Sequence, residues 1–283
     1  MGTSSAFGGP QNTSQLIPDF LIDDEPALVN PSDVSPLEGD LESVDATASP
    51  PSWRPLRAPN MSEARMNFTD YAHSGESAPL KRSMRRYVSQ GLGGPQTGAR
   101  RMARSARAGA TIAQFLRGVS RDGLQTALRR LNLERLAGLS FEALFAAIID
   151  SVLPTVQSID DDIARQALFD ALITLTDSDE VDLSNLTQDS IQRFFQYFIC
   201  SAILHRYMAD VAAKGLNVAQ SDFAYERIEG QVRDFIEASV AGEISAALEK
   251  STPLDEHFAE ATITSVFEAA WTILESVGVK QRA

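Results

Sequence analysis

Hydrophobic residues recur every three or four positions through most of the chain after residue 109, and this spacing predicts α-helices. The longest pattern follows Thr187 and covers about 27 residues, which would make a helix of about 40 Å. Its apolar face consists of Ile191, Phe194, Phe195, Phe198, Ile199, Ala202 and Ile203, followed by Tyr207, Met208 and Val211. No segment alternates convincingly between apolar and polar residues, so we expect no β-sheet.

Capping residues indicate where several of these helices begin. Ser140, Ser158 and Thr187 each precede a helical pattern, and their side chains can accept a hydrogen bond from the first turn. Another helix is predicted from about residue 222 to 249, and the pair Thr252-Pro253 is typical of a helix start. These patterns predict an all-α domain over residues 109–283, an irregular multi-helix bundle of about seven helices.

Residues 1–78 show no such periodicity, and we expect them to form a disordered, proline-rich acidic tail. Nine of the 13 prolines lie between Pro10 and Pro59, and residues 16–50 contain nine acidic residues but no Lys or Arg. A segment of this composition buries too little apolar surface to offset the entropy lost on ordering. The tail is either a solvated spacer or an interaction segment with short apolar anchors.

The charge inverts in the next part of the chain, where residues 80–121 contain ten basic residues and no acid. Leu80, Met84, Tyr87 and Val88 are spaced for one face of a short helix. We therefore predict a basic linker or helical segment over residues 79–108. After residue 137 the balance reverses again, with nine Lys and Arg against 24 Asp and Glu.

Four kinds of partner suit this basic segment: nucleic-acid phosphates, an anionic membrane surface, the acidic helices of the same chain, and an acidic partner protein. Few aromatic residues are interleaved with the cations, which argues against stacking on single strands. We favour a protein contact within or between chains over nucleic acid. The predicted contact residues are Phe7, Arg82, Arg85, Arg86, Tyr87, Arg100, Arg101, Arg104 and Arg107.

The chain offers few groups for catalysis or metal binding. It has one cysteine and three histidines, and Cys200 and His205 are five residues apart, too far round a helix to form a dyad. The acidic runs at 160–162 and 177–182 lack the spacing of a calcium loop. We expect no catalytic residue, no metal and no cofactor. Without an apolar run of ~18 residues or a signal peptide, a cytoplasmic location and no membrane association are expected.

The chain starts with small residues, Met1-Gly2-Thr3-Ser4-Ser5. Removal of Met1 would leave Gly2 with a free α-amine, whose ordinary pKa of about 7.7–8.0 leaves roughly a tenth of it nucleophilic at pH 7. A flexible tail of about 75 residues has a root-mean-square span of roughly 50 Å. This end is either a frayed terminus or a peptide presented to an enzyme.

Several motifs resemble the QatB family of Qat anti-phage system associated proteins. The resemblance covers the opening peptide with Phe7-Gly8-Gly9-Pro10, the stretch Arg85-Arg86-Tyr87-Val88, and Arg129-Arg130-Leu131-Asn132-Leu133-Glu134. It implies a role in bacterial defence against phage. QatB-like proteins work with an ATPase (QatA), a QueC-like protein (QatC) and a TatD-like nuclease (QatD).

The same resemblance implies how this chain would act. It would bind the QueC-like protein and deliver Gly2, with Thr3, Ser4 and Ser5, into the active site of that partner. There Gly2 would be conjugated to a 7-deazaguanine, and this chain would be a substrate and scaffold. The alternative is a nucleic-acid-binding module that uses residues 80–121.

Overall fold

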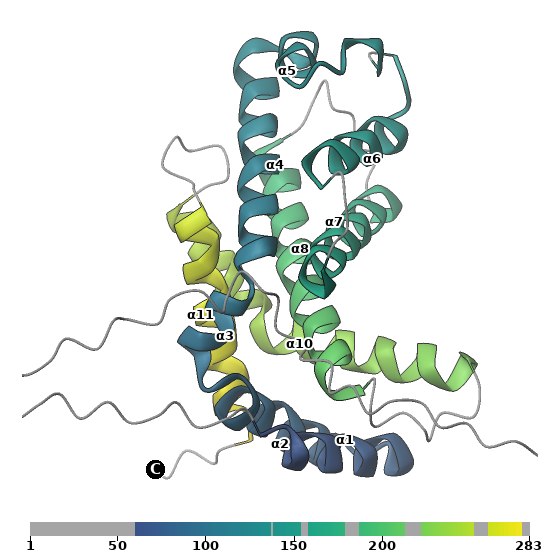
Figure 1. Cartoon of the computed structure of the whole chain (residues 1–283), viewed down its shortest axis with the longest axis vertical. Helices are drawn as coiled ribbons and strands as arrows, with labels where there is room; N and C mark the ends of the chain where they lie inside the picture. The colour runs from purple at the N-terminus through teal and green to yellow at the C-terminus, as the bar shows by residue number, and fades with distance from the viewer. Residues whose placement is uncertain are drawn as a thin grey trace, which may run out of the picture. The chain divides into compact units, whose positions relative to one another are not determined.

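The computed structural model describes residues 60–136, 138–153, 158–178, 187–212, 222–251 and 260–278 (Figure 1). All regular structure in these ranges is helical, which confirms the predicted all-α fold. The α-helices are α1 (Ser62–Ser74), α2 (Ser77–Arg86), α3 (Pro95–Arg101), α4 (Ala103–Asp122), α5 (Leu124–Arg130), α6 (Phe141–Val152), α7 (Ile159–Ser178), α8 (Gln188–Tyr207), α10 (Asp222–Lys250) and α11 (Glu260–Ser276). Two π-helical turns, η2 (Tyr87–Leu92) and η5 (Met208–Ala212), and one 3-10 turn, η3 (Glu134–Leu136), complete them.

The helices from residue 60 onward pack around a shared apolar core. Helix α7 packs along α8, and α10 contacts both α8 and α11. Helix α11 also contacts α2, α3 and α4, so the end of the chain packs against the first helices. Helix α5 lies at one end of α4, α6 lies beside the same half of α4, and α1 and α2 lie beyond the other end (Figure 1).

Hydrogen bonds confirm the capping residues that the sequence indicated. The Ser140 and Thr187 side chains accept hydrogen bonds from the N–H groups of Ala143, at 3.3 Å, and Ser190, at 3.1 Å. Ser158 accepts one from Asp161 N–H at 3.1 Å. The predicted start at residues 252–253 lies outside the described residues, and α11 is described from Glu260.

Helix α1 differs from the sequence prediction, because it lies within the range 1–78 expected to be a disordered tail. Its residue Phe68 is fully buried, with its ring centroid 5.7 Å from that of Tyr207. The Ser83 hydroxyl on α2 donates to the Ala64 carbonyl at 2.6 Å and lies 2.7 Å from the Tyr207 hydroxyl. Only Ala64, Phe68 and Tyr71 of α1 are buried, so its apolar pattern is weak. Contacts with α2 and η5, and the Phe68 contact with Tyr207 of α8, stabilise it.

Two glycines allow these helices to approach one another closely. A Cβ atom on Gly98 would lie 2.9 Å from Leu92 Cδ1 and 3.1 Å from Trp271 Cδ1. A Cβ atom on Gly109 would lie 2.8 Å from Phe198 Cε1 and 3.0 Å from Ile263 Cδ1. Packing of α3 and α4 against α8 and α11 therefore depends on the missing side chains.

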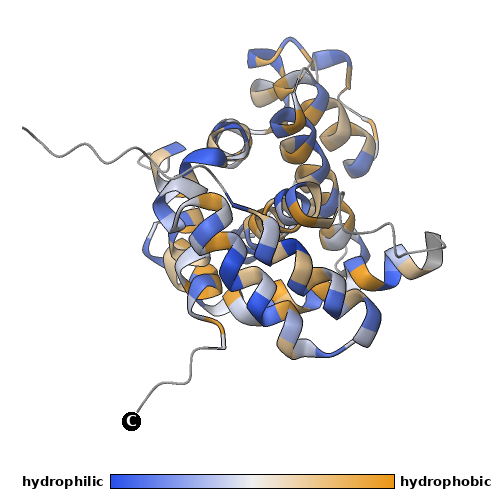
Figure 2. Ribbon diagram, turned by 60° about the horizontal axis from the view of Figure 1, so that its bottom comes forward, coloured by the Kyte–Doolittle hydropathy of each residue, from blue (hydrophilic) through white to orange (hydrophobic). Residues whose placement is uncertain are grey.

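Most helices carry hydrophobic residues on one side and hydrophilic residues on the other (Figure 2). The apolar sides form one core that includes Trp271, Tyr87, Tyr207 and Phe198, all fully buried. Among the described helices, none combines the length and the hydrophobicity that crossing a membrane requires.

Candidate functional site

The basic segment from residue 79 to 108 is packed into the helical body, where α2, η2, α3 and the start of α4 contain it. Leu80, Met84, Tyr87 and Val88 form its buried side, as their spacing predicted. The segment is therefore part of the bundle and does not act as a linker.

Tyr87 lies in the core instead of on the partner-contact surface where we placed it. Its ring centroid is 5.3 Å from that of Tyr207 and 5.9 Å from that of Trp271, both edge-on. Its hydroxyl donates to Asp210 Oδ2 at 2.8 Å, and burial raises the pKa of Tyr87 well above its ordinary value. The helical spacing that aligns Tyr87 with Met84 and Val88 directs it inward.

Several cations on the outer side of the segment pair with acids of the same chain. Arg86 Nε lies 2.8 Å from Glu63 Oε2, Arg104 Nε lies 3.3 Å from Asp161 Oδ1, and Arg107 Nε lies 3.3 Å from Glu260 Oε2. This is the contact within one chain that was among the four alternatives. The Arg86–Glu63 and Arg107–Glu260 pairs are partly exposed, and such pairs typically contribute under about 1 kcal/mol, so these two arginines can exchange their partners for others. Asp161, the partner of Arg104, is buried.

Three other predicted contact residues make no ion pair with a carboxylate in the described part of the chain. Arg82 donates a hydrogen bond to Asn67 Oδ1 at 3.0 Å. Neither Arg85 nor Arg100 forms an ion pair with a carboxylate among the described residues. Arg82 and Arg85 are three residues apart on α2 and therefore share a face. We call Arg82 and Arg85 the α2 arginine pair. Arg101 is half-buried, and its carbonyl faces Arg206 Nη2 at 3.5 Å.

The predicted N-terminal site lies outside the described residues. Gly2, Thr3, Ser4, Ser5 and Phe7 all precede residue 60, so their roles stay predictions.

The one cysteine is a core residue. Burial raises the pKa of the Cys200 thiol to about 12, which keeps it protonated at neutral pH. His205, five residues on, instead places Nε2 2.8 Å from Asp170 Oδ2. No cluster of three or more His, Cys, Asp or Glu side chains suited to a metal occurs among the described residues.

Asp170 joins α7, α8 and α10. Arg233 from α10 reaches both Asp170 Oδ2, at 3.3 Å, and Ser201 Oγ, at 3.1 Å. Burial alone would raise the pKa of Asp170, but the His205 hydrogen bond and the charges of His205 and Arg233 lower it below its ordinary value. The cluster holds three helices together through one carboxylate.

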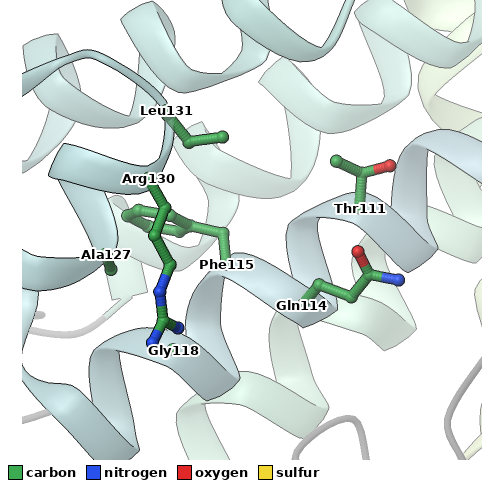
Figure 3. A pocket seen from close by; sticks show the side chains of 7 residues that line it. All are labelled: Thr111, Gln114, Phe115, Gly118, Ala127, Arg130 and Leu131. Carbon is green, nitrogen blue, oxygen red and sulfur yellow. The ribbon is translucent and has the colours of Figure 1, made fainter.

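A groove between α4 and α5 was not predicted. Its lining comprises Thr111, Gln114, Phe115, Gly118, Ala127, Arg130 and Leu131 (Figure 3). Gln114, Gly118 and Arg121 are spaced at i, i+4 and i+7, so the sequence could have shown that they share one face of α4. The contribution of α5 depends on the turn at Gly123, whose φ is 82°.

The described structure defines an all-α protein with a cationic surface on its first helices. Beyond the fold, the family model described as Qat anti-phage system associated protein QatB matches residues 93–274. The match covers more than half of the chain, so the chain belongs to the QatB family and is associated with the Qat anti-phage defence system. No curated protein and no solved structure matches the chain.

Proposed function

We propose that this protein is a non-enzymatic scaffold subunit of a Qat-like defence complex. It binds a QueC-like partner and presents Gly2 for modification with a 7-deazaguanine. The complex also contains a QatA-like ATPase and a TatD-like nuclease. The observation that carries the proposal is membership of the QatB family over residues 93–274.

The chemistry of the N-terminus supports Gly2 as the acceptor. Acylation needs an unprotonated amine, and an α-amine meets this requirement far better near neutral pH than a lysine side chain does. Glycine adds no side chain beside the amine, and Thr3, Ser4 and Ser5 are also small. The reacting groups would belong to the QueC-like partner.

The chemistry of the described residues supports a scaffold role. The Cys200 thiol is buried and protonated, so it does not supply a thiolate nucleophile. His205 shares Asp170 with Arg233, which makes it part of an interhelical contact. The α2 arginine pair remains available for an acidic surface of the partner.

The experiment is a mass measurement of the N-terminal peptide. The protein is expressed alone, with the QueC-like partner, and with that partner after substitutions in its active site. We expect added mass on Gly2 only with the intact partner, and no added mass in Gly2→Pro. Gly9→Ala serves as the matched control, because it changes a glycine of the same peptide without touching the α-amine.

Two results would contradict the proposal at different points. An unmodified Gly2 in the presence of an active, bound partner would remove the modification but leave the scaffold role. Failure of the two proteins to copurify would remove the scaffold role as well. The alternative of nucleic-acid binding by residues 80–121 would require an affinity that falls steeply with salt.

A further inference from the structure

A second groove, which we call the α7–α10 groove, lies between α7, the π-helical turn η5 and the start of α10. It has a volume of about 220 Å³. Its apolar walls consist of Ile159, Ile163, Met208, Ala209 and Tyr225. The elements that form it are neither those of the basic segment nor those of the α4–α5 groove, so this surface is separate from both.

Apolar side chains on the rim of the groove face water. Five large hydrophobic residues are exposed in the described ranges, and two of them line this groove: Ile159 is 67% exposed and Tyr225 is 39% exposed. A third, Ile173, shares a face of α7 with Ile159, because the fourteen residues between them make close to four helical turns. The apolar surface of the groove therefore continues along the outside of α7.

Helix α7 is apolar on more than the side that packs in the core. Ala164, Leu168 and Ala171 are fully buried on its inner side, while Ile159 and Ile173 are exposed. A helix on the surface of a globular protein usually carries its hydrophobic residues on one side only. Exposed apolar residues that gather beside a groove are typical of an interaction site.

One wall of the groove is a π-helical turn, an uncommon geometry that is frequent at functional sites. This turn, η5, places Met208 and Ala209 in the lining of the groove. Contacts from α1 and η2 hold it in place, since Arg65 Nη2 donates to the Asp210 carbonyl at 2.8 Å and the Tyr87 hydroxyl donates to Asp210 Oδ2 at 2.8 Å. The shape of this wall is therefore fixed by the protein itself.

The charges of the groove indicate which chemistry fits it. Asp162 lines the groove and is exposed, and none of the described residues in the lining is Lys or Arg. Burial and the charge of the Glu229 carboxylate raise the pKa of Tyr225 above its ordinary value, which places a second acid beside the groove. His205 also lines it, but its Nε2 lies 2.8 Å from Asp170 Oδ2. The groove is thus apolar with an acidic rim.

A protein segment that combines an apolar side chain with a cation matches both properties. The apolar side chain would cover Ile159 and Met208, which removes hydrophobic surface from water. The cation would lie near Asp162, and the ring of Tyr225 can also attract a Lys or Arg side chain through its face. An acidic segment would instead meet like charge at Asp162 and Glu229.

We propose that the α7–α10 groove binds a segment of a partner protein that carries an apolar or aromatic side chain next to a Lys or Arg. Its charge is opposite to that of the α2 arginine pair, so the protein can hold acidic and basic partner surfaces at the same time. The expected partners are the proteins of the Qat-like complex, and in this respect the inference rests on the proposed function.

The test places a photo-crosslinking amino acid, p-benzoylphenylalanine, at residue 225 of the full chain. The chain is expressed with the QueC-like protein, the QatA-like ATPase and the TatD-like nuclease, and crosslinked peptides are identified by mass spectrometry. We expect residue 225 to crosslink to one of these proteins, within a few residues of a Lys or Arg. The same amino acid at residue 66 is the matched control, because Met66 is an exposed hydrophobic residue of α1 outside the groove, and it should not reach that segment.

A charge reversal tests the acidic rim. Asp162→Lys should lower the crosslinking yield from residue 225 about tenfold, because it sets like charges against each other. Asp177→Lys makes the same change on α7, at an exposed residue outside the groove, and should leave the yield unchanged. A melting curve checks that both variants are folded.

Several results would overturn the proposal. A crosslink from residue 225 to residues 1–59 of the same chain would assign the groove to its own N-terminal part, and a crosslink between two copies would assign it to self-association. An acidic crosslinked segment, or equal loss of yield in Asp162→Lys and Asp177→Lys, would contradict the role of charge. Copurification without a crosslink at residue 225 would overturn this inference alone, whereas failure of all three proteins to copurify would remove the scaffold role with it.

Discussion

Two glycines in the same helix should respond in opposite ways to substitution by alanine. Gly109 and Gly118 both lie within α4, where alanine is intrinsically more favourable than glycine by about 1 kcal/mol. A Cβ at residue 109 would lie 2.8 Å from Phe198 Cε1 and 3.0 Å from Ile263 Cδ1, below ordinary contact distance. At residue 118 it would lie 3.5 Å or more from its neighbours.

The magnitudes follow from these contacts. Phe198 and Ile263 are fully buried, so the core has little room to adjust, and overpacking typically costs about 1–3 kcal/mol. After the gain in helix propensity, Gly109→Ala should destabilise the protein by up to about 2 kcal/mol. Gly118→Ala should stabilise it by up to about 1 kcal/mol, because Arg130 Nη1 is the mobile end of an exposed side chain.

Urea unfolding followed by circular dichroism measures both variants against the unsubstituted chain. In a thermal melt of a folded part of this size, each change of 1 kcal/mol in unfolding free energy should shift the melting temperature by about 2–4 °C. The reasoning would be refuted if Gly109→Ala were as stable as Gly118→Ala, since α4 would then not pack closely on α8 and α11.

Two further predictions concern charge. Because the pKa of Asp170 is lowered in the folded state, its stabilising contribution is present above the ordinary carboxyl pKa, near 3.8, and is lost as pH falls through the lowered value. Asp170→Asn should therefore make the stability fall less steeply with decreasing pH below about pH 4, as measured by urea unfolding midpoints. An unchanged slope would contradict the role of the Asp170 cluster. If the α2 arginine pair contacts the partner, Arg82→Glu with Arg85→Glu should reduce copurification with the QueC-like protein about tenfold or more. Arg129→Glu with Arg135→Glu makes the same charge change on α5 and η3 and should not reduce copurification. An equal loss in both double variants would indicate an effect of net charge alone.

The sequence was most informative where structure is decided locally. Ser140 and Thr187 cap helices through hydrogen bonds to residues three positions on, so a short stretch of sequence contains both partners. Helix α1 was missed because its few apolar residues gain their stability from Ser83 and Tyr207, which are distant along the chain.

The candidate sites show the same limit. The arginines of the basic segment could be identified from composition, but their partners Asp161 and Glu260 belong to helices much later in the chain. Tyr87 was listed as a partner contact together with the arginines around it, although its helical spacing placed it with the apolar face. The α4–α5 groove depends on the direction of the turn between the two helices, and residue spacing alone does not predict that direction.

The boundary of the family match has a practical consequence for anyone who shortens this chain. The match begins at residue 93, after α1, α2 and η2, yet Phe68 and Tyr87 from those elements cover the rings of Tyr207 and Trp271. A fragment that starts at residue 93 would leave these large rings facing water and would tend to aggregate. A start near residue 60 keeps the aromatic cluster closed, so we expect a stable fragment to be longer than the segment that the family model matches.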